Sequence, residues 1–286
     1  MPVNTRRLEI KGADGNLLIA DARGDASAPG VLLLHGGGQT RHAWGGTADR
    51  LAAAGRYAVS LDLRGHGESE WVEFPGAYGL EQFAADLRVV MRRFERPPAL
   101  VGASLGGLTS LLFAGEQAPG SAAAVVLVDV APRIEREGAD RITAFMLAKP
   151  EGYESLEEVA DAIAEYTRNR SRTRNLESLR KNLREGPDGR FRWHWDPRFV
   201  GGEGPNELTD RTRLDRAARA IEVPSLVVRG RESDLLSVEG ARELVDLLPQ
   251  GEFVDVSGAG HMVAGDRNDV FTRAVSEFLD RALPVE

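Results

Sequence analysis

Hydrophobic residues along the chain form short continuous runs that alternate with longer stretches in which they recur every three or four positions. Continuous runs are typical of strands buried on both faces, and the longer spacing is typical of helices with one buried face. The runs that predict strands cover residues 31–34, 57–63, 99–101, 125–130, 224–229 and 252–256. The stretches that predict helices cover residues 47–54, 80–94, 107–117, 240–248 and 269–283. Regular alternation of strand and helix predicts an α/β fold with a mostly parallel central sheet flanked by helices.

Two departures from this alternation divide the chain. Near the N-terminus, residues 8–10 and 17–21 flank a turn-rich tetrapeptide and predict a β-hairpin. Beyond residue 131 the alternation stops, and amphipathic patterns at residues 155–168 and 175–184 predict helices instead. We therefore expect a core in two parts, residues 1–131 and 221–286, with an inserted helical cap at residues 132–220.

Residues 102–106, Gly-Ala-Ser-Leu-Gly, follow one predicted strand and open a predicted helix. A G-x-S-x-G sequence in this position forms a sharp strand-to-helix turn, which needs glycines where a side chain would not fit. Ser104 would stand at the apex of the turn, beside the N-terminus of the helix, where backbone N–H groups favour negative charge. A small-residue turn without chemistry is the alternative explanation of the pentapeptide alone.

Three other strand ends carry residues of chemical interest. His35 and three glycines follow the strand at residues 31–34, Asp234 follows the strand at 224–229, and His261 follows the last predicted strand. In open α/β sheets ligands bind beyond the carboxyl ends of the strands. A serine hydroxyl needs a base to become a nucleophile, and the base needs a carboxylate that fixes its tautomer. These side chains therefore suggest nucleophilic catalysis.

With these motifs the sequence resembles a capped α/β-hydrolase of the esterase, cofactor-free haloperoxidase and epoxide-hydrolase-like branch. Residues 35–38, 62–69, 102–107, 230–234 and 260–261 match this pattern. The resemblance implies that Ser104 is the nucleophile, Asp234 the acid and His261 the base of a Ser-His-Asp triad. It also implies an oxyanion hole formed by the N–H groups of Gly37 and Leu105.

Two points qualify the resemblance. Asp129 also stands at a strand end, and Glu232 is a neighbour of Asp234, so both are alternatives for the acid. Epoxide hydrolases and haloalkane dehalogenases carry an aspartate where Ser104 stands. A serine at that position implies an acyl ester intermediate rather than an alkyl ester, and argues against epoxide opening by the usual route.

A substrate pocket is harder to derive from the sequence than the triad. The candidates for its lining are Gly38, Trp44, Trp193, Trp195 and Met262. Aromatic side chains in a cap also pack against the helices of the cap itself, so core packing is the alternative for the tryptophans.

Composition excludes several classes of protein. A formal net charge of −8 and a pI near 5.3, with no basic block, argue against nucleic-acid binding. The chain has no cysteine, which excludes disulfides and thiolate chemistry. The glycine loops lack a Walker lysine, and no group of histidines and carboxylates has metal-ligand spacing, so we predict no metal, nucleotide or flavin. No secretory signal or apolar membrane span is visible, which favours a cytoplasmic location.

The sequence therefore predicts a carboxylesterase-like serine hydrolase acting on a small-molecule acyl substrate. A lactone, an amide or the carbon–carbon bond of a diketone is an alternative for the same triad, because the choice of bond depends on the pocket. A hydrolase-fold protein that binds a ligand without turnover is the alternative outside enzymes. Neither the physiological substrate nor the oligomeric state follows from the sequence.

Overall fold

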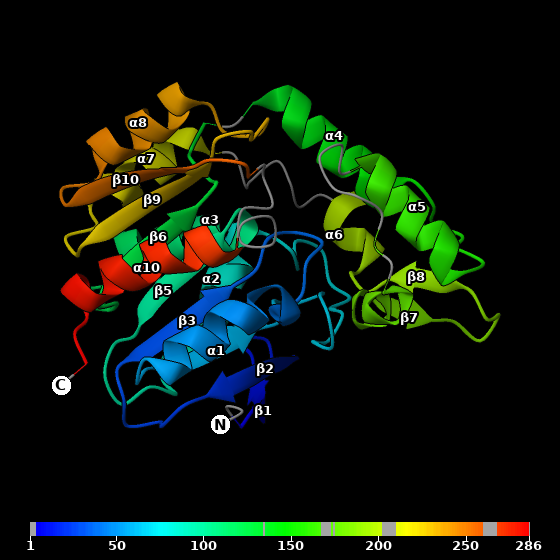
Figure 1. Cartoon of the computed structure of the whole chain (residues 1–286), viewed down its shortest axis with the longest axis horizontal. Helices are drawn as coiled ribbons and strands as arrows, with labels where there is room; N and C mark the ends of the chain where they lie inside the picture. The colour runs from blue at the N-terminus through cyan, green and yellow to red at the C-terminus, as the bar shows by residue number, and fades with distance from the viewer. Residues whose placement is uncertain are drawn as a thin grey trace.

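A computed structural model describes residues 4–133, 135–166, 173, 175–201, 210–259 and 268–285. At its centre is an eight-stranded sheet in the order β1-β2-β4-β3-β5-β6-β9-β10 (Figure 1). The antiparallel pairs are β1 with β2 and β2 with β4, and the other neighbours run parallel. The strands are β1 (Arg6–Lys11), β2 (Leu17–Arg23), β3 (Gly30–Leu34), β4 (Tyr57–Leu61), β5 (Ala99–Ala103), β6 (Ala124–Val128), β9 (Ser225–Gly230) and β10 (Gly251–Val256). The predicted hairpin and the mostly parallel sheet are confirmed.

Helices cover both faces of the sheet. The helices α1 (Gly45–Ala53) and α10 (Asn268–Ala282) pack on one face, and α2 (Leu80–Met91), α3 (Leu105–Glu116), α7 (Arg211–Arg219) and α8 (Val238–Leu247) pack on the other. The short helix η1 (Arg41–Trp44) precedes α1.

The hydrophobic runs bury both faces of each central strand. In β3, Val31 and Leu33 join the core under α1 and α10, while Leu32 and Leu34 point to the opposite core, and all four are fully buried. Successive side chains of a strand point to opposite faces, so a strand covered on both sides must be apolar throughout. This is why continuous runs predicted the parallel strands well.

The segment between β6 and α7 lies beside the sheet, at the right of Figure 1. It contains α4 (Arg136–Leu147), α5 (Leu156–Tyr166), η2 (Leu176–Asn182), β7 (Leu183–Glu185), β8 (Phe191–Trp193) and α6 (Pro197–Gly201). We call these elements the cap. The cap has a small core of its own, in which Tyr153, Val159 and Phe191 are buried. The helix α7, which the predicted cap boundaries include, packs against α3, where a Cβ on Gly115 would lie 2.2 Å from the Ala217 carbonyl oxygen.

One predicted cap helix is wrong in kind. In place of one helix over residues 175–184, the chain forms a 3₁₀ helix, η2 (Leu176–Asn182), that leads directly into the two-stranded hairpin of β7 and β8. The side chain of Asn175 accepts a hydrogen bond from the Ser178 N–H at the start of η2, and Leu183 pairs with Trp193 across the hairpin. The pairing stops the helix after two turns, although Leu176, Leu179 and Leu183 have helical spacing.

No helix among the described residues is long and apolar enough to cross a membrane.

Candidate active site

Ser104 occupies a strained turn between β5 and α3. Its φ is +46°, and its N–H donates to the Val128 carbonyl of the neighbouring strand at 3.0 Å. A non-glycine residue at positive φ is uncommon, and such strain concentrates at functional sites. The turn can form only because residue 106 is glycine. A Cβ at this position would lie 2.4 Å from the Leu34 carbonyl oxygen and would clash with it. Ser104 therefore sits at the carboxyl edge of the sheet, at the N-terminus of α3.

The glycine loop, residues 35–38, lies directly against Ser104. The Gly106 N–H donates to the His35 carbonyl at 3.1 Å, and a Cβ on Gly36 would lie 3.4 Å from the Ser104 Cβ. The Gln39 side chain accepts from the Gly36 N–H at 2.9 Å, which fixes the loop from its far end. The structure thus brings together the loop of Gly37 and the turn of Ser104 and Leu105, where an oxyanion hole was predicted.

Cap side chains cover the glycine loop. A Cβ on Gly38, whose φ is +74°, would meet Met146 of α4 at 3.2 Å and Trp195 at 3.4 Å. A Cβ on Gly37 would meet the ring of Phe199, in α6, at 3.3 Å. Gly38 and Trp195 were predicted to line a pocket, and they lie next to each other at the loop whose Gly36 packs against Ser104. Met146 and Phe199 were not predicted, although Ile142, Phe145 and Met146 have the spacing of a helix face.

The other predicted pocket residues differ in position. Trp44 is 1% exposed and packs against Phe271 between α1 and α10, which is the position of a core residue. Trp193 stacks on Trp195 with ring centroids 4.9 Å apart and so supports the covered side of the loop. His261, the predicted base, and Met262 lie outside the described residues.

Three buried histidines join the glycine loop to the cap. His35 donates from Nδ1 to the Gly36 carbonyl and accepts at Nε2 from the Leu63 N–H, which fixes its neutral tautomer. His194, in the cap, accepts at Nδ1 from the Gly67 N–H at 2.7 Å and donates from Nε2 to the Gly38 carbonyl. The ring of His66 lies between them, with centroids 5.1 Å from His35 and 5.9 Å from His194.

Burial keeps these three rings uncharged. Desolvation lowers the pKa of His35 to about 4 and that of His66 to about 3. Desolvation also lowers the pKa of His194 well below its ordinary value. At neutral pH the hydrogen bonds of these neutral rings therefore have a structural role. Those of His194 hold the cap against the glycine loop.

Two aspartates follow neighbouring strands at this edge of the sheet. Asp129, after β6, is fully buried with φ +47°, and its carboxylate accepts from the Gly230 N–H at 3.1 Å and the Ser233 hydroxyl at 2.6 Å. Asp234 lies in the loop after β9, where its side chain is 39% exposed and forms an ion pair with Arg141 of α4. The two carboxylates thus face different partners, one inside the core and one in the cap.

The turn of residues 64–69 follows β4 and carries several buried polar side chains. Arg64 is fully buried and donates to the Asp86 carboxylate at 2.7 Å and to the Ala77 carbonyl at 2.9 Å. The Ser69 hydroxyl donates to the Asp62 carbonyl and accepts from the Ile19 N–H. The polar side chains of this turn are therefore engaged in holding loops together.

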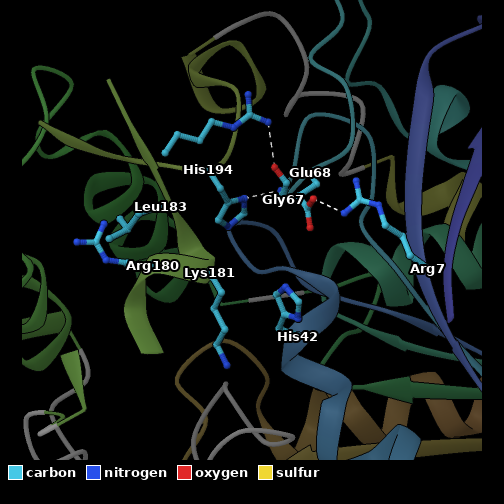
Figure 2. Close-up of a pocket in the computed structure, with 9 residues that line it drawn as sticks. Arg7, His42, Gly67, Glu68, Arg180, Lys181, Leu183 and His194 are labelled. Atoms are coloured by element: carbon cyan, nitrogen blue, oxygen red, sulfur yellow. Dashed lines mark hydrogen bonds and ion pairs between the residues drawn. The ribbon is translucent and has the colours of Figure 1, made fainter. Parts of the chain in front are cut away.

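A groove of about 620 Å³ opens where the core meets the cap, next to His194 (Figure 2). Its lining is mostly basic: Arg7, His42, Gly67, Glu68, Arg180, Lys181, Leu183, Arg184 and His194. Figure 2 shows Arg7 reaching toward Glu68, and Arg180 also pairs with carboxylates, Glu177 and Glu185. Ser104 is not part of this lining, so the groove is separate from the turn that carries the serine.

Comparison with known proteins agrees with this geometry. Residues 31–274 match the model of a family described as the alpha/beta hydrolase family. The chain is 30% identical over 274 residues to the esterase Rv0045c of Mycobacterium tuberculosis, covering 92% of this chain and 86% of that protein. It is 28% identical over 281 residues to a 2-(acetamidomethylene)succinate hydrolase of Mesorhizobium japonicum, covering 96% and 95%.

Solved structures of hydrolases have the same fold as this chain. The crystal structure of E-2-(acetamidomethylene)succinate hydrolase superposes with a TM-score of 0.81 at 24% identity, covering 97% of this chain and all of that one. At that identity the superposition shows the fold alone, which is the mostly parallel sheet with flanking helices described above. Together with the family match over most of its length, it establishes that the chain belongs to the alpha/beta hydrolase family and is a hydrolase.

Proposed function

We propose that the protein cleaves an ester bond of a small molecule through an acyl-enzyme intermediate on Ser104. The observation that carries the proposal is the strained turn at Ser104, held by Gly102 and Gly106 against the glycine loop. The strain exposes one hydroxyl at the carboxyl edge of the sheet, next to the N-terminus of α3. A relative named as an esterase, 30% identical over nearly the whole chain, supports ester cleavage.

In the proposed reaction the Ser104 hydroxyl attacks the ester carbonyl while His261 takes its proton. The N–H groups of Leu105 and Gly37 donate to the oxyanion that forms, and each such donor is typically worth about 3 kcal/mol of transition-state stabilisation. The imidazolium returns the proton to the leaving alcohol, and the acyl group remains on Ser104. A water molecule, deprotonated by the same base, then attacks the acyl ester and releases the acid.

Backbone dipoles support the same assignment. The partial positive charge at the N-terminus of α3 lies where negative charge develops, and the amide groups are fixed before the reaction starts. Met146, Trp195 and Phe199 pack against Gly37 and Gly38 and reduce the exposure of the loop to water, which strengthens these interactions.

Replacement of Ser104 by alanine tests the proposal. Ser104→Ala is expected to lower kcat for p-nitrophenyl acetate and butyrate by at least about 10³-fold and to leave the circular dichroism spectrum unchanged. Ser110→Ala is the matched control, because the Ser110 hydroxyl belongs to the same helix and donates only to the Gly106 carbonyl in this structure. Mass spectrometry after treatment with a fluorophosphonate should locate the adduct on Ser104. Full activity of Ser104→Ala, or no adduct on the parent protein, would show that the serine is not the nucleophile.

A further inference from the structure

The groove between the core and the cap is basic, although the chain as a whole is acidic. Of the described residues that line it, four carry a guanidinium or ammonium group, Arg7, Arg180, Lys181 and Arg184, and one, Glu68, carries a carboxylate. The whole chain has 44 acidic and 36 basic residues, with a formal net charge of −8. The groove is therefore a local exception in the charge of the surface, and it attracts anions.

Two of the four cations are already paired. Arg7 forms an ion pair with Glu68, on the same side of the groove. Arg180 donates to the carboxylates of Glu177 and Glu185. These hydrogen bonds raise the pKa of Arg180 above its ordinary value. Arg7 and Arg180 therefore have counter-charges within the protein.

Lys181 and Arg184 are the cations that remain. Within the part of the chain that the structure describes, neither forms an ion pair with a carboxylate. The Lys181 side chain is exposed and lies beside His42 of the core (Figure 2). Burial lowers the pKa of the His42 ring, and the charges of Arg41 and Lys181 lower it further. Two positive charges thus face the groove without a negative partner.

The protein itself holds Arg184 in position. Its Nη2 donates to the Gly67 carbonyl at 2.9 Å, and its guanidinium lies 4.4 Å from the centre of the Trp71 ring. Stacking on an aromatic face orients a guanidinium for binding. Desolvation lowers the pKa of Arg184, and the carboxylates of Asp196 and Asp62 offset this only in part. A guanidinium has five N–H donors, and those of Nε and Nη1 make no hydrogen bond to a described residue, so they remain for a ligand.

From these contacts we propose that the groove binds a small organic anion with two negative charges, a phosphate monoester or a dicarboxylate, between Lys181 and Arg184 of the cap and His42 of the core. Two negative charges match the two unpaired cations, and the guanidinium fork fits phosphate and carboxylate oxygens alike. The volume of about 620 Å³ lies within the usual range of small-molecule sites, about 300–1,000 Å³. Ser104 does not line the groove, so the anion is a second ligand and not the ester that the serine attacks.

A ligand in the groove joins the cap to the core beside the glycine loop. Lys181 belongs to η2 and Arg184 to β7, whereas Gly67 belongs to the core. The Gly67 N–H donates to Nδ1 of His194, and Nε2 of the same ring donates to the Gly38 carbonyl. The groove and the glycine loop therefore share the ring of His194. Because the ligand contacts both sides, binding should hold the cap against the core.

Isothermal titration calorimetry of the full chain tests the proposal, with glucose 6-phosphate as the phosphate monoester and succinate as the dicarboxylate. At least one of them should bind with a dissociation constant below about 1 mM. Binding should weaken several-fold between about 50 and 300 mM NaCl, because salt screens exposed charges. Glucose and acetate are the neutral and singly charged controls and should bind at least about tenfold more weakly. The comparison of glucose 6-phosphate with succinate shows which of the two anions the site prefers.

Three variants locate the site. Lys181→Gln and Arg184→Gln should each weaken binding by about tenfold or more, because each removes charged hydrogen bonds to the ligand. Arg180→Gln is the matched control. It removes the same charge from the same lining, but Arg180 is engaged by Glu177 and Glu185, so the affinity should change less than about twofold.

Folding does not decide the outcome of these measurements. Arg184→Gln loses the bond to the Gly67 carbonyl and can be destabilised, whereas Lys181→Gln removes an exposed side chain and should unfold at the temperature of the parent. Ser104→Ala should bind the anion as the parent does, because the serine is outside the groove. Binding and ester cleavage can therefore fail separately, and each failure is recognisable.

Hydrogen exchange at the Gly67 amide shows whether the anion bridges the cap and the core. The ligand should slow this exchange in the parent and not in Lys181→Gln. Unchanged exchange with ligand bound overturns the inference, and so does the absence of binding by both glucose 6-phosphate and succinate. Equal weakening by Arg180→Gln and Lys181→Gln overturns it as well, because the anion would then respond only to the net charge of the surface.

Discussion

Gly102 and Gly106 approach each other so closely across the turn of Ser104 that a Cβ on Gly102 would lie 2.3 Å from the Gly106 carbonyl oxygen. The obstacle is backbone and cannot rotate away. A methyl group at residue 102 must therefore move the start of α3 relative to β5, and with it the N–H of Leu105 and the hydroxyl of Ser104.

Gly102→Ala should accordingly lower both stability and activity. Overpacking of this kind costs about 1–3 kcal/mol in the free energy of unfolding, which urea titration at constant pH measures. Gly45→Ala is the matched control, because Gly45 has helical φ and ψ and no atom within 4 Å of a new Cβ. The control should unfold at the same urea concentration as the parent or a higher one. Equal urea midpoints for Gly102→Ala and the parent would contradict the close approach.

The three buried histidines make stability depend on pH in a known direction. His35, His66 and His194 have pKa values below the ordinary value of 6.5, near 4 for His35 and near 3 for His66, because burial disfavours the charged ring. Between these values and 6.5 the unfolded chain binds protons that the folded chain does not. Their contribution to stability is therefore complete above about pH 6.5 and is lost as the pH falls toward 4.

His194→Gln isolates one of these groups. Each histidine adds up to about 1.4 kcal/mol per pH unit to the slope of unfolding free energy against pH, so the variant should show a slope smaller by about that amount between pH 6 and 5. Glutamine can still accept from the Gly67 N–H and donate to the Gly38 carbonyl. His42→Gln serves as control, because His42 is only half-buried and its pKa is lowered less. Parallel curves for His194→Gln and the parent would mean that His194 is not neutral when folded.

The buried ion pair of Arg41 and Asp62 should matter more to stability than any surface pair. Asp62 is fully buried and accepts from the Arg41 N–H at 2.6 Å and the Glu68 N–H at 2.9 Å, besides its contact with the Arg41 guanidinium. Removal of one partner from a buried pair costs about 3–5 kcal/mol, because the other charge stays buried. The Arg41 guanidinium keeps its ion pairs with Asp21 and Glu68 in Asp62→Asn, so the variant should lose about 2–3 kcal/mol in urea titration, near or below the lower end of this range.

The control for that measurement is Asp140→Asn, which breaks the exposed pair of Arg136 and Asp140 on α4. Both side chains are more than two-thirds exposed, so the change should remain within about 0.5 kcal/mol. A similar effect of the two substitutions would argue that Asp62 is solvated in solution.

The sheet could be predicted from the sequence because its strands are buried on both faces and therefore apolar throughout, as in β3. The cap could not be predicted to the same degree. Its residues 175–184 have helical spacing, but contacts distant in sequence decide their structure: Asn182 accepts from the Thr40 hydroxyl and from the His194 N–H, and Leu183 pairs with Trp193.

The candidate site divides in the same way. Ser104 and the glycine loop follow from short motifs whose local geometry needs glycine, and the structure brings them together. The aspartates at the two strand ends are different, because the sequence does not tell whether the carboxylate of Asp129 or that of Asp234 points into the core. That choice depends on the turn formed by the Ser233 hydroxyl with Leu235 and Leu236, and on Arg141, which belongs to a helix that the sequence analysis did not predict.

Met146 should limit the length of the acyl group. It is 8% exposed, and its thioether lies next to Gly38 in the loop that faces Ser104. Met146→Ala opens space at this position, and a few methylene groups in an apolar pocket change discrimination by roughly ten- to a hundredfold. The ratio of kcat/KM for p-nitrophenyl octanoate to that for the acetate should therefore rise on the order of tenfold. Leu147→Ala is the control, because Leu147 is adjacent on α4 but 45% exposed. If both variants kept the parent ratio, the acyl group would have to bind away from Met146, whereas an equal rise in both would point to a change in the cap as a whole.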